Sequence, residues 1–301
     1  MKKFILNLLI FAAILVVCDC VLGKVFDLMA ANVKGGDTQV DNIICDELED
    51  EVLVFGSSRA MHHYDPFILQ DSLHRSCYNC GFDGARIILT YGRWKMINQR
   101  YTPKMVVLEV TPGYDLLVDD NHAALTFLRR HYDRPSIDSI CWDVDYTERY
   151  KNISQCFRYN SFPIKLLVEC IHPLRTVEKG YQPKDKQMLY EPIVSSSDAE
   201  KVYEYDPLKL YYLERFIREC SGKAQLIMCA SPLYRNTSDD VYQPVKEMAE
   251  KYGIPFLNHY CDSTFNFNKA YFYDSSLMNR SGATRYSEII AHGVKQVLDT
   301  H

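Results

Sequence analysis

The sequence predicts an α/β domain built on a doubly wound parallel sheet, preceded by an apolar amino-terminal segment. Short apolar runs without polar alternation recur along the chain, as expected of strands buried on both faces. Each run is followed by a segment with helical hydrophobic spacing. The composition agrees, since 47% of the 301 residues are hydrophobic and only 13 are Gly and 12 Pro. These values exclude collagen-like and disordered chains.

Four segments have the composition of buried strands. They are 51–55, 104–110, 224–230 and 255–257, and the first three end in Gly, Pro or Ser turn residues. Helices are expected from Asp65 and Pro66 onward, because an acidic cap before Pro is a common helix start. Further helices are predicted by hydrophobic spacing over 87–97, 210–220, 241–252 and 283–297.

Residues 115–205 interrupt this alternation with aromatic-rich sequence of mostly helical pattern, including 123–132 and 164–171. We interpret them as an insertion within a single domain that covers residues 45–301. In doubly wound folds ligands bind at the carboxyl ends of the strands. The insertion is therefore expected to cover or frame that edge of the sheet.

The amino-terminal residues 1–30 resemble a signal anchor or a signal peptide. Lys2 and Lys3 precede an apolar run over 4–17, and apolar residues resume after Asp19 as far as Phe26. This length reaches the roughly 20 residues that a bilayer core requires, and we favour an uncleaved anchor. A cleaved signal and a buried amphipathic helix remain as alternatives. The two lysines would stay in the cytoplasm and place the body outside it, either anchored or secreted.

The charge balance bears on possible partners and cofactors. The chain has 34 Lys and Arg against 39 Asp and Glu, a net charge of -5, so a nucleic-acid partner is not expected. Neither GxGxxG nor GxxxxGK[ST] follows a strand, so no nucleotide cofactor is indicated. The eleven cysteines are too scattered for a disulfide scaffold. Cys77 and Cys80 form a CxxC with no second ligand pair, so no metal site is predicted.

The residues after the first strand carry the first candidate for chemistry. Ser57 and Ser58 lie in a Gly-Ser-Ser turn that follows the buried run 52–55. A serine at such a turn presents its hydroxyl at the carboxyl edge of the sheet and its N–H at a helix start. This position suits a nucleophile.

Three segments in order resemble conserved blocks of the SGNH/GDSL hydrolase superfamily, a flavodoxin-like three-layer fold. The sequence VLVFGSSR over 52–59 resembles the first block, in which Ser58 matches the nucleophile. NCGFDG over 79–84 resembles the second, and Gly84 would join the N–H of Ser58 in the oxyanion hole. YDSSLMNRSGA over 273–283 resembles the last block, in which Asp274 matches the acid that orients the catalytic His.

Two positions depart from the family pattern. Gly113 stands where the third block has the Asn that donates to the oxyanion, and a missing donor costs about a hundredfold or more in turnover. Leu277 stands where the family has its catalytic His. An aliphatic side chain cannot accept the serine proton, and serine is a poor nucleophile without a base. Asp274 is left without its usual partner.

Three other histidines are candidate surrogate bases. His62 and His63 follow Ser58 by one helical turn, and His259 follows the last predicted strand. The alternative is that His62 and His63 make hydrogen bonds within the loop and pack the start of the helix. Arg59 is a candidate for contact with an anionic substrate or for stabilising a carboxylate, and equally for a structural ion pair with Asp274 or Asp83.

The resemblance implies a membrane-anchored, extracytoplasmic protein that acts on acylated cell-envelope glycan as an esterase or O-acyltransferase. The expected partners are an ester substrate, the membrane and an envelope-assembly protein, with no cofactor. The alternative is a pseudoenzyme, a binding or assembly subunit for envelope polysaccharide that keeps the crevice without the chemistry. Leu277 and Gly113 favour this second interpretation, and the sequence leaves the choice between enzyme and binding subunit open.

Overall fold

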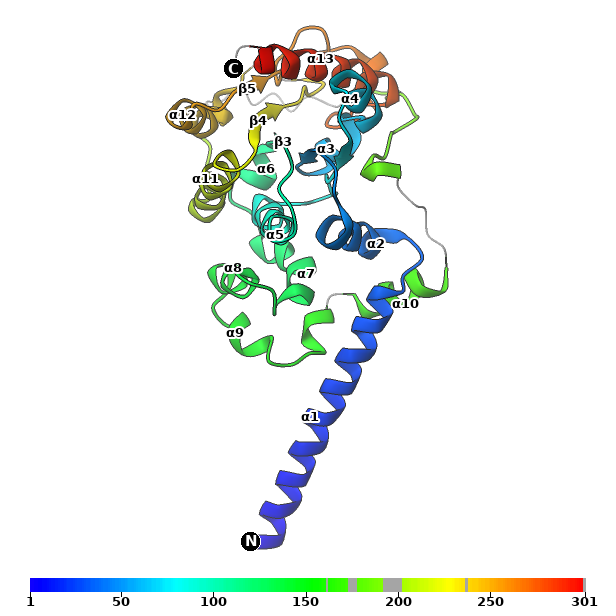
Figure 1. Cartoon of the computed structure of the whole chain (residues 1–301), viewed down its shortest axis with the longest axis vertical. Coiled ribbons are helices and arrows are strands. Elements are labelled where there is room, and N and C mark those ends of the chain that lie inside the picture. Colours follow the sequence, from blue (N-terminus) through cyan, green and yellow to red (C-terminus); the bar gives the residue numbers. More distant parts are fainter. Residues whose placement is uncertain (161, 173–177, 192–201, 236–237, 300–301) are drawn as a thin grey trace. The chain divides into compact units, whose positions relative to one another are not determined.

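Figure 1 shows the fold in a computed structural model of the chain, which describes residues 1–160, 162–172, 178–191, 202–235 and 238–299. The chain divides into two compact units. The first unit combines Met1–Glu47 with Asn121–Thr176, and the second combines Leu48–Asp120 with Val177–His301. The expected insertion, residues 115–205, is therefore divided between the two units. Residues 121–176 belong to the first unit with the amino-terminal segment, and the remainder belongs to the second unit.

The second unit is built on a five-stranded sheet in the order β2-β1-β3-β4-β5. Every neighbouring pair is parallel, which confirms the predicted doubly wound α/β class. The strands are β1 Val52–Phe55, β2 Cys77–Asn79, β3 Met105–Glu109, β4 Gln225–Ala230 and β5 Phe256–Asn258. β2 was not predicted, because its three residues are too few to show a pattern. The strand order reverses between β1 and β3, where such folds place their ligand crevice.

Helices pack on both faces of this sheet. The helices of this unit are α3 Ser58–His63, α4 Pro66–Leu73, α5 Ile87–Ile97, α6 Pro112–Asp115, α11 Pro207–Ser221, α12 Gln243–Tyr252 and α13 Arg280–Asp299. Val54 and Val107 lie in a core with residues of α4 and α13. Phe55 lies edge-on against Phe216 of α11 on the opposite face, with ring centroids 5.9 Å apart. Strand residues alternate between the two cores, as the pleat of a sheet requires.

Local signals place the starts of two helices. The Asp65 carboxylate accepts the N–H of Phe67 at 2.9 Å and caps α4. Asp206 caps α11 in the same way through the N–H of Leu208 at 2.8 Å. Pro66 and Pro207 follow these caps at the first helical positions. The Asp-Pro pattern therefore marks both starts, because Pro needs no hydrogen-bond acceptor there.

The described residues of the first unit form helices joined by turns. The helices are α1 Lys2–Ala31, α2 Gly36–Asn42, α7 Leu125–Leu128, α8 Ile137–Val144, α9 Glu148–Lys151 and α10 Pro163–Ile171, with a π-helix over Ile43–Glu47 and short 3-10 turns. The predicted helix over 123–132 is α7 with 3-10 turns on both sides, and the one over 164–171 is α10. α1 is long and apolar enough to cross a membrane.

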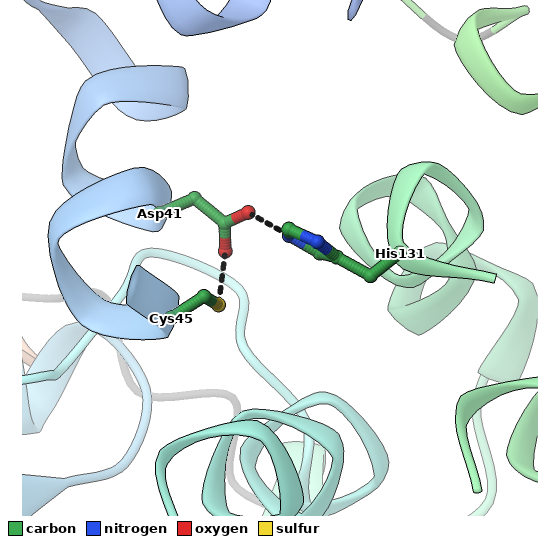
Figure 2. A group of neighbouring side chains, drawn as sticks. All are labelled: Asp41, Cys45 and His131. Carbon is green, nitrogen blue, oxygen red and sulfur yellow. Dashed lines mark hydrogen bonds and ion pairs between the residues drawn. The ribbon is translucent and has the colours of Figure 1, made fainter. Parts of the chain in front are cut away.

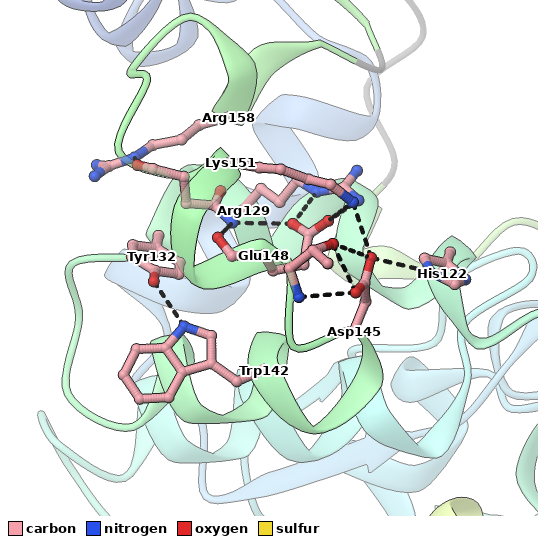
Figure 3. Close-up of polar contacts among 10 residues, drawn as sticks. His122, Arg129, Tyr132, Trp142, Asp145, Glu148, Lys151 and Arg158 are labelled. Carbon is pink, nitrogen blue, oxygen red and sulfur yellow. Dashed lines mark hydrogen bonds and ion pairs between the residues drawn. The ribbon is translucent and has the colours of Figure 1, made fainter.

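A buried carboxylate organises the middle of the first unit. Figure 3 shows Glu148 accepting two hydrogen bonds from the guanidinium of Arg129, at 2.8 and 3.0 Å, while Lys151 also pairs with it. The side chain of Asn152 donates to the same carboxylate at 2.9 Å. The side chain of Glu148 is fully buried. These donors lower the pKa of Glu148 despite its burial, so the carboxylate stays charged and fixes α9 against the turn at Arg129.

All eleven cysteines are free thiols. Six of them are buried, including Cys77, Cys220 and Cys229. Burial raises the pKa of the Cys229 thiol well above its usual value. These side chains act as small apolar groups in the core rather than as reactive thiolates.

Candidate functional site

The turn between β1 and α3 carries the predicted serine pair. Gly56 has φ of +144°, and a Cβ atom there would lie 2.6 Å from the carbonyl oxygen of Glu109, so only glycine fits. Ser57 is buried, and its Oγ lies 2.7 Å from Oγ1 of Thr111, which follows β3. This bond spans the point where the strand order reverses. Ser58 is half-buried and begins α3, so its hydroxyl remains partly open to solvent.

The loop after β2 lies directly beside this turn. The N–H of Cys80 donates to the Val54 carbonyl at 2.7 Å, and the N–H of Phe82 donates to the Gly56 carbonyl at 3.2 Å. Gly84 has φ of +71°, with no atom within 4 Å of the place a Cβ would take. The first two sequence motifs therefore lie next to each other at the carboxyl edge, and Gly84 borders open space.

Glu109, at the end of β3, is the centre of the polar network at this edge. Its fully buried carboxylate accepts from the hydroxyl of Tyr64 and from both the hydroxyl (2.8 Å) and the N–H (3.0 Å) of Ser231. Burial raises the pKa of Glu109, while the positive charge of Arg59 opposes that rise. Neither Glu109 nor Ser231 was predicted from the sequence. The available signal was a single charge in an otherwise apolar strand.

Arg59 points into the protein rather than toward a ligand. Its side chain is only 8% exposed, and its Nη1 lies 3.8 Å from the Glu109 carboxylate. The guanidinium also lies over the Tyr260 ring, 5.5 Å from its centroid. Its ion-pair partner is therefore Glu109, and not Asp83 or Asp274 as the sequence suggested. Arg59 thus lies beside a buried carboxylate, which agrees with the expectation that it stabilises one, while contact with a substrate stays a prediction.

Both nitrogens of His63 are occupied by hydrogen bonds. Nε2 accepts the backbone N–H of Met278 at 2.9 Å, so Nδ1 carries the proton and donates to Oγ of Ser231 at 2.9 Å. Burial, reinforced by the charge of Arg59, holds the pKa of His63 well below its usual value. His63 is thus a neutral, fully bonded ring, with no lone pair left to accept a proton from Ser58.

His62 is occupied in a different way. Nδ1 lies 2.6 Å from the carbonyl oxygen of Gln182, and Nε2 lies 3.1 Å from the carboxylate of Asp83. Both ring nitrogens therefore have a hydrogen-bond partner. The hydrogen bond with His62 lowers the pKa of Asp83. Both histidines thus make structural hydrogen bonds, but with partners in distant segments and not within their own loop as expected. The contact with Gln182 places the segment after 177 beside α3.

The Asp274 carboxylate makes hydrogen bonds within the turn that it begins. Its Oδ1 accepts the backbone N–H groups of Ser276 at 2.7 Å and Leu277 at 2.8 Å. The loop reaches α3 through the bond from Met278 to His63, so the last sequence motif lies close to the first. No hydrogen bond joins Ser58 to Asp274 in the described part of the chain. Leu277 is half-buried, next to the residue that contacts α3.

His259 lies at the far side of the same edge. It follows β5, and its Nδ1 pairs with Asp262 at 3.2 Å. β1 and β5 are separated by three strand spacings, about 14 Å. This separation places the imidazole of His259 out of hydrogen-bonding reach of Ser58. Among the described residues, no imidazole is hydrogen-bonded to the Ser58 hydroxyl.

The segment after β3, where the family has its third block, contains a buried carboxyl group that was not predicted from the sequence. Gly113 lies in α6, where it supplies no side-chain donor. Asp115, two residues later, is buried and accepts the Thr111 N–H at 2.7 Å. Burial raises the pKa of Asp115 to about 7, although this hydrogen bond and the charge of Lys209 oppose the rise. Asp115 therefore holds the backbone of Thr111 in place, and the hydroxyl of Thr111 is hydrogen-bonded to Ser57.

One cluster in the first unit contains donor types that zinc prefers. Figure 2 shows buried Asp41 between Cys45 and His131, whose candidate ligand atoms lie within 4.8 Å of one another. Arg130, however, pairs with the Asp41 carboxylate at 3.0 Å and donates to Nε2 of His131, also at 3.0 Å. A guanidinium therefore holds the lone pairs that a metal would need, and its charge repels a cation. The cluster fits a buried ion-pair network better than a metal centre.

Comparisons with known proteins give little beyond the fold. The sequence matches no protein-family model and no curated protein sequence. One solved structure, from Streptococcus pneumonia, carries the name platelet activating factor. The alignment covers 92% of this chain and 96% of the chain in that structure, at 11% sequence identity and a TM-score of 0.43. A structural-genomics target from Lactobacillus plantarum aligns with 85% of this chain and 99% of its own, at 13% identity and a TM-score of 0.41. Neither similarity indicates a chemistry for this chain.

Proposed function

We propose that the second unit is a non-catalytic relative of the SGNH hydrolases that binds rather than cleaves its ligand. The observation that carries this proposal is the state of His63. Its lone pair accepts the N–H of Met278, next to the Leu277 that replaces the family's catalytic His. A serine hydroxyl without a base is a poor nucleophile. Among the described residues, Ser58 therefore has no imidazole partner to take its proton.

The arrangement of the three motifs supports the relationship to this superfamily. They lie at the carboxyl edge of a parallel sheet of order 2-1-3-4-5. Backbone hydrogen bonds join the first motif to the second, and the bond from Met278 to His63 joins the last motif to the helix in which the first motif ends. In doubly wound folds this edge is the ligand site. Ser58, which is only partly buried, and the open space at Gly84 leave a place for a polar ligand.

The proposed location is the outer face of a membrane. Lys2 and Lys3 precede the apolar stretch of α1 and favour retention of that end in the cytoplasm. α1 would then anchor both units outside. The ligand class that fits this location and the resemblance is acylated cell-envelope glycan, recognised together with an envelope-assembly protein. In this role the domain is a binding or assembly subunit.

A second candidate is ester hydrolysis or O-acyl transfer, and the position of Ser58 is the observation that favours it. Ser58 would attack the ester carbonyl, the N–H groups of Ser58 and Gly84 would hold the oxyanion, and the acyl group would pass to water or a sugar hydroxyl. The serine proton must pass to a base that is not bound to Ser58 in this structure.

Active-site labelling separates the two candidates. The full-length chain in detergent is treated with a fluorophosphonate, and its intact mass and peptides are measured, with Ser58→Ala as the control. We expect no adduct on Ser58, because phosphonylation requires an activated hydroxyl. An adduct on Ser58 that is absent from the Ser58→Ala variant would overturn the non-catalytic proposal in favour of the enzyme.

Binding is tested on the same protein. Titration calorimetry compares an O-acetylated envelope glycan with the same glycan after mild alkaline deacetylation. We expect binding that depends on the acyl group and that is weakened at least about tenfold by Ser58→Trp, which places a bulky side chain at the proposed binding position. Equal affinity for both glycans, or no binding to either, would remove acylated glycan as the ligand.

A further inference from the structure

The exposed surface of α10 is apolar along one face. Ile164, Leu167, Val168 and Ile171 occur at positions i, i+3, i+4 and i+7, and their exposed fractions are 78, 49, 40 and 61%. Such spacing places the four side chains on one side of a helix. This α10 face is unusual for a water-exposed helix, because contiguous apolar surface in contact with water is unfavourable.

The opposite side of α10 packs on the end of α1. Leu166 is fully buried in a cluster with Ala30, Tyr159 and Phe162, and the thiol of Cys170 donates to the carbonyl of Met29 at 3.3 Å. Figure 1 shows α10 beside the carboxyl-terminal end of α1. The α10 face is therefore attached to the helix that is long enough to cross a membrane.

Asp19 shows where the first unit meets the membrane-crossing part of α1. Its carboxylate accepts from the Ser154 hydroxyl at 2.6 Å and from the N–H groups of Gln155 at 2.8 Å and Cys156 at 3.1 Å. Gly23 allows this approach, because a Cβ there would lie 2.4 Å from Cβ of Gln155. A carboxylate in an apolar span is costly without partners. The 154–156 turn supplies those partners at the level of Asp19.

The length of α1 sets the depth of α10. A hydrocarbon core of about 30 Å takes about 20 helical residues, so a span that starts at Phe4 ends near Gly23. α10 contacts α1 at Met29 and Ala30, roughly 9 to 11 Å farther along the axis. The polar layer of a bilayer extends about 5 to 8 Å beyond the core, and helix side chains reach about 5 Å from the helix axis, so an apolar face of α10 that points toward the membrane lies within this layer.

We infer that the first unit rests on the membrane through the α10 face, which inserts into the outer lipid interface beside α1. Exposed apolar residues of α1 support lipid as the occupant, because Val21, Val25 and Leu28 remain 56, 42 and 65% exposed above and below the level of Gly23. The exposed apolar surface of α1 thus extends past Gly23 to the level at which α10 contacts α1. Ile153, 74% exposed next to the turn that binds Asp19, extends it.

This inference does not depend on the chemistry of the second unit. It gives the first unit a role, which is to fix its own orientation at the membrane surface. A single helix allows rotation about its axis and tilting, whereas a second apolar contact at one side restricts both.

Tryptophan quenching by brominated lipids tests the contact. The full-length chain, carrying Trp142→Phe to reduce background, is reconstituted at one copy per nanodisc of phosphatidylcholine and phosphatidylglycerol. Ile164→Trp and Ile171→Trp report on the α10 face. Val21→Trp on α1 is the control for lipid contact, and Tyr211→Trp, 49% exposed on α11, is the control for water contact. The native Trp94 is fully buried and gives a constant signal.

We expect bromine in the acyl chains to quench both α10 variants at least about half as strongly as the lipid control and to leave the water control unchanged. Quenching of the α10 variants no greater than that of the water control would overturn the inference. Blue-shifted emission without bromine quenching would also overturn it, by showing that protein covers the face. If the unmodified chain fails to float with vesicles, the inference is also overturned, because it requires α1 to lie in a membrane. Labelling of Ser58 by a phosphonate would contradict the proposed function and leave this inference intact.

Discussion

The backbone N–H of Met278 donates to Nε2 of His63 across 2.9 Å. This bond joins the loop before α13 to the helix that follows β1, although 215 residues separate the two positions. The same ring donates from Nδ1 to Ser231, whose hydroxyl donates to Glu109. His63 therefore lies within a directed chain of hydrogen bonds that links four segments of the carboxyl edge.

Replacement of His63 by alanine is expected to destabilise the second unit by about 3 kcal/mol. The change removes a buried ring and leaves the Met278 N–H without its acceptor. The measurement is the free energy of unfolding in urea for the detergent-solubilised chain, with Tyr211→Ala on the exposed side of α11 as the control. A loss no larger than that of the control would show that the chain of bonds contributes little.

Glu109→Gln is expected to destabilise the protein by roughly 3 to 5 kcal/mol, because it leaves the buried guanidinium of Arg59 without its counter-charge. The double variant Arg59→Met with Glu109→Gln removes both charges and should recover a large part of that loss. Unfolding free energies of the two single variants and the double variant form a cycle. Additive losses in this cycle would contradict a coupled ion pair.

Leu277→His is expected to create measurable esterase activity toward p-nitrophenyl acetate, roughly a hundredfold above the unmodified chain. Position 277 is half-buried, and Asp274 binds its backbone N–H rather than its side chain, so the substitution leaves the turn in place. Leu277→Gln is the matched control, and adding Ser58→Ala should abolish the new activity. Equal rates for the His and Gln variants would mean that position 277 does not face Ser58.

Asp115 predicts a specific dependence of stability on pH. Burial raises its pKa to about 7, from a usual value near 4, so the folded chain binds a proton more tightly than the unfolded chain. The contribution of this proton to the free energy of unfolding is fully present at low pH. As the pH rises from about 4 to about 7, the free energy of unfolding falls by at most roughly 4 kcal/mol.

Comparison with Asp115→Asn isolates this contribution. The amide oxygen can still accept the Thr111 N–H, but the side chain no longer titrates. The difference in unfolding free energy between the two proteins is therefore expected to change between about pH 4 and pH 7 in favour of the variant. A difference that is constant over this range would show that Asp115 ionises normally.

Local patterns in the sequence predicted most of the sheet and its helices. Buried strands such as 52–55 are uninterrupted apolar runs in the sequence, and caps such as Asp65 followed by Pro66 mark helix starts within one residue. Both signals involve only a few neighbouring residues, so they can be recognised without knowledge of the tertiary structure. The sequence also identified α1 as a long apolar segment and Ser58 as the first residue after a sharp turn.

Other features depended on contacts between distant segments. The sequence did not reveal that Glu109, Arg59 and Ser231 form one network, because a charge in a strand shows its partner only after the strands are placed side by side. Nor could it decide whether His62 and His63 were free bases, since their partners lie up to 215 residues away. The chain itself determined that a serine follows β1 and that no histidine stands at position 277. Tertiary packing determined which lone pairs were already used, because hydrogen bonds to buried groups are set by the neighbours that folding supplies.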